Sequence, residues 1–313
     1  MPADLTSPRR RGLIAAALAA FLAGSGTRLS AAGHPLTSAA PLAVTPAPQA
    51  IPLLPRGGRS VLPEFRVVAH YGAPQARALG ILGFGTPAAA AARLQREAHR
   101  YTGPARRPVL PAMELISVIV NAGPGRDGTF RSRQRRAVIL RYLRAARKAR
   151  ALLILDVQPG RSDFLTEARA LAEFLVEPDV GLALDPEWRM APGQIPGRVI
   201  GSFDAAELNE VTAWLSGLVA RRNLPDKLVV VHQFTDGMIR RRRGLRSPAG
   251  VDLVVNADGF GTASAKINTY RRVTRDRRGL HAGFKLFFVE DTGLMSPARV
   301  LRLRPPPELV IYE

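Results

Sequence analysis

The sequence predicts an α/β protein, a single (β/α)8 TIM-like barrel, and two observations lead to this fold class. From Phe65 onward, eight short apolar runs alternate with amphipathic runs, which is the pattern of parallel strands that return through crossover helices. Several runs, such as 152–155 and 228–231, are continuously apolar, as expected for strands buried on both faces. The count of eight, with no helix after the last strand, favours a closed barrel over a doubly wound open sheet.

Each element follows from its local pattern. The expected strands lie at 65–71, 109–114 (or on to 120), 151–158, 180–188, 228–234, 251–258, 283–289 and 309–312. Helices are expected at 86–101, 133–150, 163–176, 204–222 and 264–274, with shorter ones after the fifth strand and from Ser296. Thr86 followed by Pro87 is typical of a helix start, and Asp204 with Glu207 forms a capping box.

Composition narrows the classes of protein. The 313 residues, 46% of them hydrophobic, suffice for one large domain with a sizeable core. The chain has no cysteine, which excludes disulfides, thiolate metal sites and a cysteine nucleophile. The net charge is +20, with 45 lysines and arginines. This charge fits either an anionic partner or a GC-rich coding bias that spreads arginine along the chain.

Residues 1–33 are predicted to be an export signal. Arg9–Arg11 form a basic region, and the apolar run Gly12–Ala23 is too short to span a membrane comfortably. A cleavage region follows at Ser30–Ala32, and Arg10-Arg11 fits a twin-arginine signal. A Sec signal and an uncleaved anchor are the alternatives. Residues 34–63, rich in Pro and Ala, are expected to be a flexible linker to the barrel domain at 64–313. We expect a secreted or envelope-associated monomer without a further membrane span.

The expected strands turn polar at their carboxyl ends, where barrel enzymes carry their active sites. Polar residues recur in most of the strands, which predicts that they converge on one pocket. The residues at these ends are His70, Tyr71, Glu114, Asp156, Gln158, Asp185, Glu187, His232, Gln233, Asn256, Asp258, Lys285, Glu290 and Asp291.

Asp185-Pro186-Glu187-Trp188 is the sharpest local motif. Residues i and i+2 of a strand share a face, so Asp185 and Glu187 are expected to point into the pocket together. Neighbouring carboxylates raise the pKa of one member and leave an acid beside a base, as glycosidic-bond cleavage requires. Trp188 would offer a flat face to a sugar ring. Alternatively, Asp185 caps a loop and Glu187 pairs with a nearby arginine.

Other strand-end residues complete the predicted site. Asp156 is a candidate partner carboxylate for Glu187, and Glu114 is a candidate binding group; both also suit structural hydrogen bonding. The remaining candidate binding residues are Tyr71, His70, Gln158, His232, Gln233, Asp258 and Lys285. Lys285 would either form a Schiff base or, more simply, neutralise the acidic cluster. No HExxH spacing, dinucleotide loop, P-loop or serine elbow is present, so no metal or cofactor is expected.

Four segments resemble an uncharacterised family of exported proteins, often described as lipoproteins, from high-GC actinobacteria. The segments are 156–167, 181–189, 231–234 and 295–300, and the likeness covers 65–313. The resemblance implies secretion and a glycosidase-like barrel, but no established reaction or catalytic residue. The chain lacks the cysteine on which a lipid anchor would be attached.

These observations predict a secreted, glycoside-hydrolase-like enzyme acting on cell-wall or environmental polysaccharide. Glu187 would be the general acid, with Asp185 or Asp156 as its partner. Two alternatives stay open: a non-catalytic barrel that binds carbohydrate or an anionic wall polymer, and another barrel enzyme such as a lyase, aldolase or phosphodiesterase. No nucleic-acid-binding motif is present, and nucleic acid is not expected as a partner.

Overall fold

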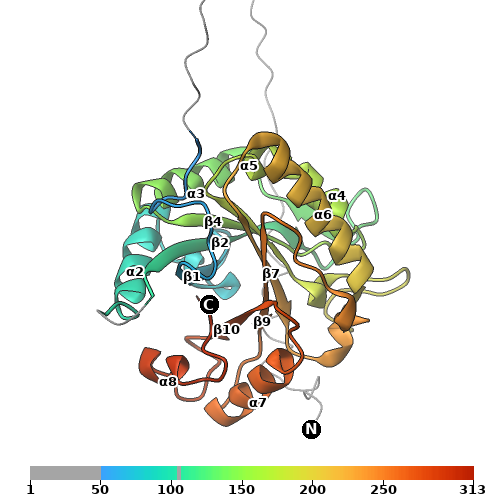
Figure 1. Cartoon of the computed structure of the whole chain (residues 1–313). Coiled ribbons are helices and arrows are strands. Elements are labelled where there is room, and N and C mark those ends of the chain that lie inside the picture. The colour runs from blue at the N-terminus through green and yellow to red at the C-terminus, as the bar shows by residue number, and fades with distance from the viewer. Residues whose placement is uncertain (1–50, 104–106) are drawn as a thin grey trace, which may run out of the picture.

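The computed structural model describes residues 51–103 and 107–313, which form a closed barrel of parallel strands with helices outside it (Figure 1). The barrel strands are β1 (Arg66–Gly72), β2 (Val109–Val120), β4 (Leu152–Val157), β5 (Val180–Leu184), β7 (Lys227–Gln233), β9 (Val251–Ala257), β10 (His281–Leu286) and β11 (Leu309–Tyr312). The hydrogen-bonded order is β1-β11-β10-β9-β7-β5-β4-β2, and β2 pairs with β1 to close the ring. The predicted (β/α)8 barrel is confirmed, and the open sheet is excluded.

Three short strands lie outside the ring. β3 (Arg131–Arg133) pairs antiparallel with the end of β2, while β6 (Phe203–Asp204) pairs with β8 (Ile239–Arg240). Arg240–Arg243 was expected on a short helix after the fifth strand. Instead, Arg240 ends β8, and a 3-10 turn, η5 (Arg242–Gly244), follows.

The helices form the outer layer around the strands. They are α2 (Pro87–His99), α3 (Arg136–Lys148), α4 (Phe164–Ala170), α5 (Ala172–Leu175), α6 (Ala205–Arg222), α7 (Ala263–Thr274) and α8 (Pro297–Leu301). Thr86 caps its helix by accepting a hydrogen bond from the amide of Ala89, and Asp204 accepts one from the amide of Ala206. Glu207, the expected second member of the capping box, accepts instead from the amide of Phe164 (3.3 Å) and from Arg189 (2.9 Å). The single helix expected at 163–176 is divided at Leu171 into α4 and α5.

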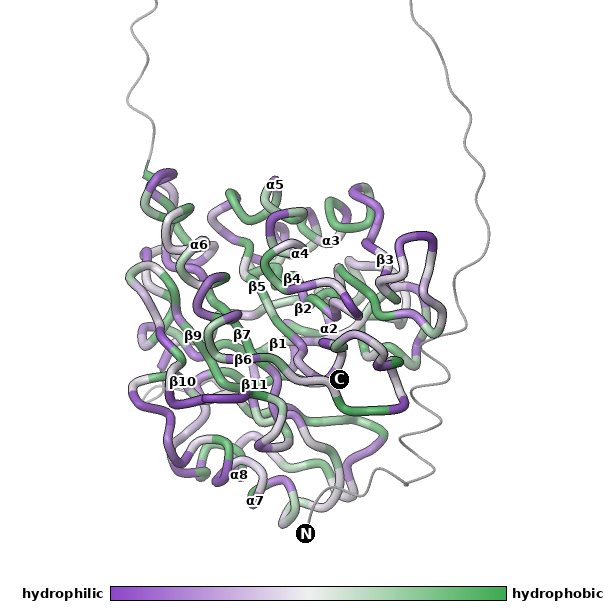
Figure 2. The backbone as a smooth tube through the Cα atoms, turned by 90° about the vertical axis from the view of Figure 1, so that its right-hand side faces the viewer, coloured by the Kyte–Doolittle hydropathy of each residue, from purple (hydrophilic) through white to green (hydrophobic). Residues whose placement is uncertain are grey.

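Two hydrophobic layers hold the barrel together. Along each strand, alternate side chains point outward to the helices or inward to the barrel axis; in β1, Val68 belongs to the outer core, and Val67 and Ala69 to the inner one. Figure 2 shows hydrophobic residues concentrated along the strands and hydrophilic residues on the outer turns. Because both faces of the strands are covered, the strands are buried almost throughout.

The amino-terminal end of the barrel is closed by residues that the composition assigned to the linker. Leu54, Val61 and Leu62 are buried in the inner core, and the amide of Leu62 donates to Asp252 at the start of β9 (2.9 Å). Packing of 51–63 therefore extends the folded part before residue 64. The predicted export signal and the linker up to residue 50 lie outside the described residues.

A buried carboxylate ties β3 to the loop after β4. Glu167 is fully buried and accepts hydrogen bonds from Arg131 (2.8 Å), Arg133 (2.7 Å) and the hydroxyl of Ser162 (2.6 Å). Glu167 itself is removed from water, so its charge needs these two arginines as partners.

We expect Glu167→Ala to lower the free energy of unfolding by about 1.5–3 kcal/mol, because it removes charge-assisted hydrogen bonds from two arginines that stay partly hydrated. The matched control is Glu173→Ala, which removes a half-exposed pair with Arg136 and should change stability by less than about 1 kcal/mol. Urea unfolding measures both. Equal effects of the two substitutions would contradict this role of Glu167.

Candidate active site

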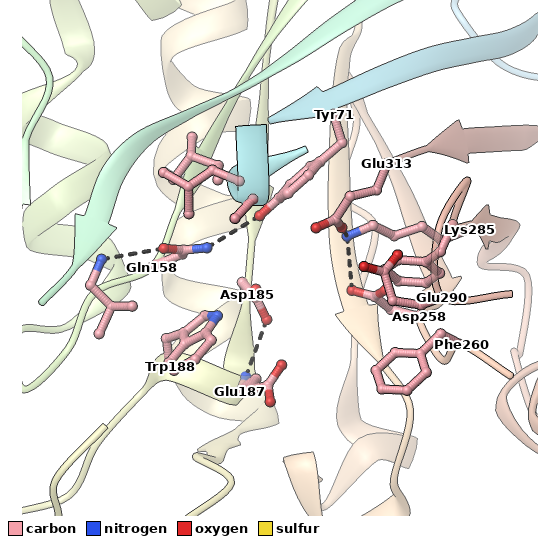
Figure 3. A pocket seen from close by; sticks show the side chains of 15 residues that line it. Tyr71, Gln158, Asp185, Glu187, Trp188, Asp258, Phe260, Lys285, Glu290 and Glu313 are labelled. Atoms are coloured by element: carbon pink, nitrogen blue, oxygen red, sulfur yellow. Dashed lines mark hydrogen bonds and ion pairs between the residues drawn. The ribbon is translucent and has the colours of Figure 1, made fainter. Parts of the chain in front are cut away.

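A pocket opens at the carboxyl ends of the barrel strands (Figure 3). Its volume is about 120 Å³, small compared with the roughly 300–1,000 Å³ of most ligand pockets. The lining residues are Tyr71, Ala78, Leu79, Ile116, Val120, Gln158, Asp185, Glu187, Trp188, Asp258, Phe260, Lys285, Phe287, Glu290 and Glu313. Figure 3 shows Gln158, Asp185, Glu187 and Trp188 along one wall, facing Asp258, Lys285, Glu290 and Glu313.

The Asp185–Trp188 motif lines this pocket, but its backbone conformation differs from the predicted one. β5 ends at Leu184, and Pro186–Trp188 form a 3-10 turn, η3. The expectation that the strand continues to Trp188 is therefore wrong. The Asp185 carboxylate caps the turn by accepting a hydrogen bond from the Glu187 amide (3.3 Å), as the alternative interpretation proposed. Asp185, Glu187 and Trp188 nevertheless all line the pocket.

Beneath and beside the pocket, five ionisable side chains form a row of alternating charge. Glu114 contacts His232 (Oε1 to Nε2, 2.8 Å), and His232 contacts Asp258 (Nδ1 to Oδ2, 3.1 Å). Lys285 Nζ then bridges Asp258 (3.3 Å) and Glu313 (2.7 Å). Each member comes from a different strand or its carboxyl end: β2, β7, β9, β10 and β11. We call Glu114, His232, Asp258, Lys285 and Glu313 the charge row.

Mutual pairing keeps three members of the row ionised despite their burial. Burial works to lower the pKa of His232, but Glu114 and Asp258 outweigh it and hold that pKa well above its usual range. Burial also works to lower the pKa of Lys285, but the negative charges of Asp258 and Glu313 outweigh it and raise that pKa. Burial works to raise the pKa of Asp258, and Lys285 and His232 outweigh it and lower that pKa. Lys285 is thus a neutralising cation, as expected, and not the free amine that a Schiff base needs.

Tyr71 lies between Lys285 of the charge row and the side chains of Asp156 and Gln158. Its ring lies under the Lys285 ammonium, with Nζ 3.8 Å from the ring centroid, which is a cation–π contact. Its hydroxyl donates to Asp156 (3.1 Å) and accepts from the amide of Gln158 (3.2 Å). Gln158 in turn accepts from the amide of Val120 (3.2 Å). These bonds fix the floor of the pocket.

Two further carboxyl groups lie outside the row and have no cation of their own in it. Burial raises the pKa of Asp156 to about 7, with His232 opposing and the Glu114 charge adding to the rise. Burial likewise raises the pKa of Asp185 well above its usual range; His232 opposes this, and the charges of Asp156 and Glu187 add to it. Asp185 lines the pocket, so the site has at its wall a carboxyl group whose pKa is raised by its surroundings.

Two predicted binding residues face away from the pocket. His70 and Gln233 each neighbour an inward residue in sequence, so they point outward by strand alternation. The His70 ring packs edge-on against Phe288 and Tyr312. Gln233 bonds to Arg242 (3.0 Å) and to the carbonyl of Thr235 (3.1 Å). Neither is among the residues that line the pocket.

Glu290 was expected only as a strand-end residue, and seven further lining residues were not predicted from the sequence: Ala78, Leu79, Ile116, Val120, Phe260, Phe287 and Glu313. Glu313 follows the last strand directly, the same position that marked the other strand ends, so this signal was present in the sequence.

One group of side chains has the spacing of a metal site. Ligand atoms of Glu114, Asp156 and His232 all lie within 4.8 Å of one another, and Glu114 Oε2 and Asp156 Oδ1 have no hydrogen-bond partner. A divalent cation bound there would be held by two carboxylates and one imidazole, a set that suits several metals. In the present geometry both His232 nitrogens already contact carboxylates, and the imidazolium supplies the positive charge. The expectation of no metal stays a prediction.

Comparison with family profiles and with curated proteins finds no match. Among solved structures, the chain is similar to 2,3-dimethylmalate lyase, a PEP mutase/isocitrate lyase superfamily member. The TM-score is 0.46 at 14% identity, over 80% of this chain and 75% of that one. It is also similar to a hyperthermophilic endo-β-1,4-glucanase, with a TM-score of 0.33 at 9% identity, over 65% of this chain and 77% of that one. These likenesses carry no argument about chemistry. Among the described residues, no helix has the length and apolar character to cross a membrane.

We expect Asp156→Asn to remove part of the pH dependence of stability. The pKa of Asp156 is about 7 in the folded chain against an ordinary 3.8, so folding favours its protonated form. This contribution is full below about pH 4 and is lost as the pH rises to about 7. The unfolding free energy of Asp156→Asn relative to the unmodified chain should therefore increase between pH 5 and pH 8. Urea unfolding at both values tests this, with the exposed Asp236→Asn as control; parallel pH curves would contradict it.

Proposed function

We propose that this protein is a glycoside-hydrolase-like enzyme that cleaves a glycosidic bond of cell-wall or environmental carbohydrate. One observation carries the proposal: Asp185 and Glu187 line the same pocket with Trp188, and burial raises the pKa of Asp185. Glycosidic cleavage needs such a pair, one carboxyl group to donate a proton and one carboxylate to act at the sugar carbon.

Burial favours Asp185 over Glu187 as the general acid, the reverse of the sequence-based expectation. Asp185 is buried, whereas Glu187 is half-buried, and a desolvated carboxyl group retains its proton at higher pH. Asp156, also expected as a partner, lies below the pocket and is held by Tyr71. In this proposal its contribution is electrostatic: when Asp156 is ionised, its charge raises the pKa of Asp185.

The proposed reaction uses both carboxyl groups of the wall. Asp185 donates its proton to the glycosidic oxygen as the bond to the anomeric carbon breaks, and the aglycone leaves as an alcohol. The Glu187 carboxylate either attacks the anomeric carbon or takes a proton from the attacking water. Water supplies the hydroxyl that ends on the sugar, and its remaining proton restores Asp185 or stays on Glu187 until it is released to solvent.

The pocket lining supports a small, ring-shaped substrate. Trp188, Phe260 and Phe287 offer apolar ring surfaces, and Glu290, Asp258 and Glu313 offer acceptors for hydroxyl groups. A volume of about 120 Å³ suits a single sugar unit better than several consecutive ones. We therefore propose that the enzyme acts on a terminal sugar or a short glycan.

We expect Asp185→Asn and Glu187→Gln each to lower kcat by about 100-fold or more, measured by release of nitrophenol from a panel of nitrophenyl glycosides. Asp185→Asn should lose more activity on poor leaving groups than on good ones and should lose the alkaline limb of the pH–rate profile, because this limb reports its deprotonation. If Glu187 is the nucleophile, azide should rescue Glu187→Gln by forming a glycosyl azide.

The control is Asp236→Asn, an exposed change outside the pocket, which should retain full activity. Full activity of Asp185→Asn or Glu187→Gln would overturn the assignment. If the unmodified chain binds a sugar saturably but does not hydrolyse any glycoside, the non-catalytic carbohydrate-binding alternative is favoured.

We also propose that the protein is exported through the twin-arginine pathway, on the basis of Arg10-Arg11 and the apolar run after it. The double substitution Arg10→Lys, Arg11→Lys should retain the full-length chain in the cytoplasm, because that pathway reads the arginine pair. Cell fractionation and immunoblotting measure the outcome. Unchanged export of the double variant would point to the Sec pathway instead.

A further inference from the structure

The end of the barrel opposite the pocket carries a concentration of arginine. The loops that lead into β10 and β11 lie at the amino ends of the strands, whereas the pocket lies at the carboxyl ends. α7 and α8, which precede these loops, lie side by side in both views (Figures 1 and 2). We define the arginine surface as Arg271, Arg275, Arg277, Arg278, Arg299, Arg302 and Arg304.

These arginines line two adjoining hollows. The larger, with a volume of about 840 Å³, lies between the end of α7 and the loop before β11. The smaller, about 250 Å³, lies between α7 and α8. Arg271 and Arg304 line both hollows, so the two form one continuous, concave surface.

The positive charge of this surface is mostly uncompensated. Asp276 is the one acidic residue in the lining of the two hollows, and it already contacts Arg243 (2.8 Å) and Arg278 (3.3 Å). Within the described part of the chain, Arg271, Arg275, Arg299 and Arg302 form no ion pair with a carboxylate, and all four are exposed. A surface that carries this much unpaired charge attracts polyanions.

The shape and composition of the surface restrict the kind of anion. Guanidinium groups bind phosphate through paired N–H donors, and several of them spaced along a hollow match a chain of repeated phosphates. The one aromatic residue in the lining, Tyr270, is fully buried, and its hydroxyl bonds to the carbonyl of Pro305 (2.7 Å). Without exposed rings, the surface lacks the stacking platform that single-stranded nucleic acids use. Its concave form also suits a polymer chain better than a flat bilayer.

We propose that the arginine surface is a binding site for a phosphodiester polymer of the cell envelope, of the polyol-phosphate type. Because it lies at the far end of the barrel from the pocket, it binds the polymer independently of any reaction there and leaves the mouth of the pocket accessible.

The test measures binding of the full chain to purified poly(glycerol phosphate) by titration calorimetry at several salt concentrations. The triple substitution Arg271→Ser, Arg275→Ser, Arg304→Ser should weaken binding tenfold or more. It should also flatten the plot of log K against log salt by roughly 0.7 for each phosphate that the variant no longer neutralises.

The matched control removes the same charge elsewhere. Arg141→Ser, Arg144→Ser, Arg222→Ser changes three exposed arginines on α3 and α6 and should weaken binding less than twofold. Both triples should retain the thermal midpoint of the unmodified chain, which separates loss of the site from loss of the fold. Asp185→Asn should bind the polymer normally, so failure of the catalytic proposal leaves this one intact.

Three outcomes would overturn the proposal: no binding of the polymer by the unmodified chain, equal weakening by the two triples, or unchanged binding by the first triple. Tighter binding to phosphatidylglycerol vesicles or to a single-stranded oligonucleotide, at matched phosphate concentration, would also overturn it in favour of that partner.

Discussion

The charge row is the constraint on which the upper half of the barrel depends. Glu114, His232 and Lys285 are buried in the interior, where each ion alone would be strongly unfavourable, while Asp258 and Glu313 are partly exposed at the pocket. Alternation of sign makes the arrangement tolerable, because every cation lies between two anions at 2.7–3.3 Å. Both cations of the row are already paired with its own carboxylates, so neither Asp156 nor Asp185 has a cation of its own. The raised pKa of Asp185 is therefore a consequence of how the neighbouring strands are already paired.

The lower half of the barrel is built on the opposite principle. Leu228, Val230 and Leu309 fill it with apolar side chains, and Leu54 and Leu62 close its end. Side chains are also closely packed next to the charge row. A methyl group at Gly283 would lie 2.6 Å from the side-chain oxygen of Asn256, and the side-chain nitrogen of Asn256 lies 3.2 Å from His232 Nδ1. A glycine on β10 thus leaves room for the Asn256 side chain next to the imidazole.

The sequence predicted the barrel, its eight strands and most of the polar residues that line the pocket, because apolar runs and polar strand ends are local signals. It could not assign the face of each residue. In β7 the run Leu228–Val231 is apolar on both faces, so nothing in it tells that His232 points inward and Gln233 outward. For the same reason, His70 was predicted to face the pocket although it points outward. The end of β5 depended on Pro186 and on the carboxylate of Asp185 capping the turn, an interaction that becomes visible only once the backbone is in place.

The two ends of the molecule carry opposite electrostatic character, with acidic groups around the pocket and arginines around α7 and α8. A positive surface and an acidic pocket thus lie at opposite ends of a barrel whose net charge is +20. In the field of a polyanion, encounters that lead with the arginine surface would be favoured over those that lead with the pocket. Salt would slow this association by screening the charges. Orientation would then be settled during diffusion, ahead of any specific contact.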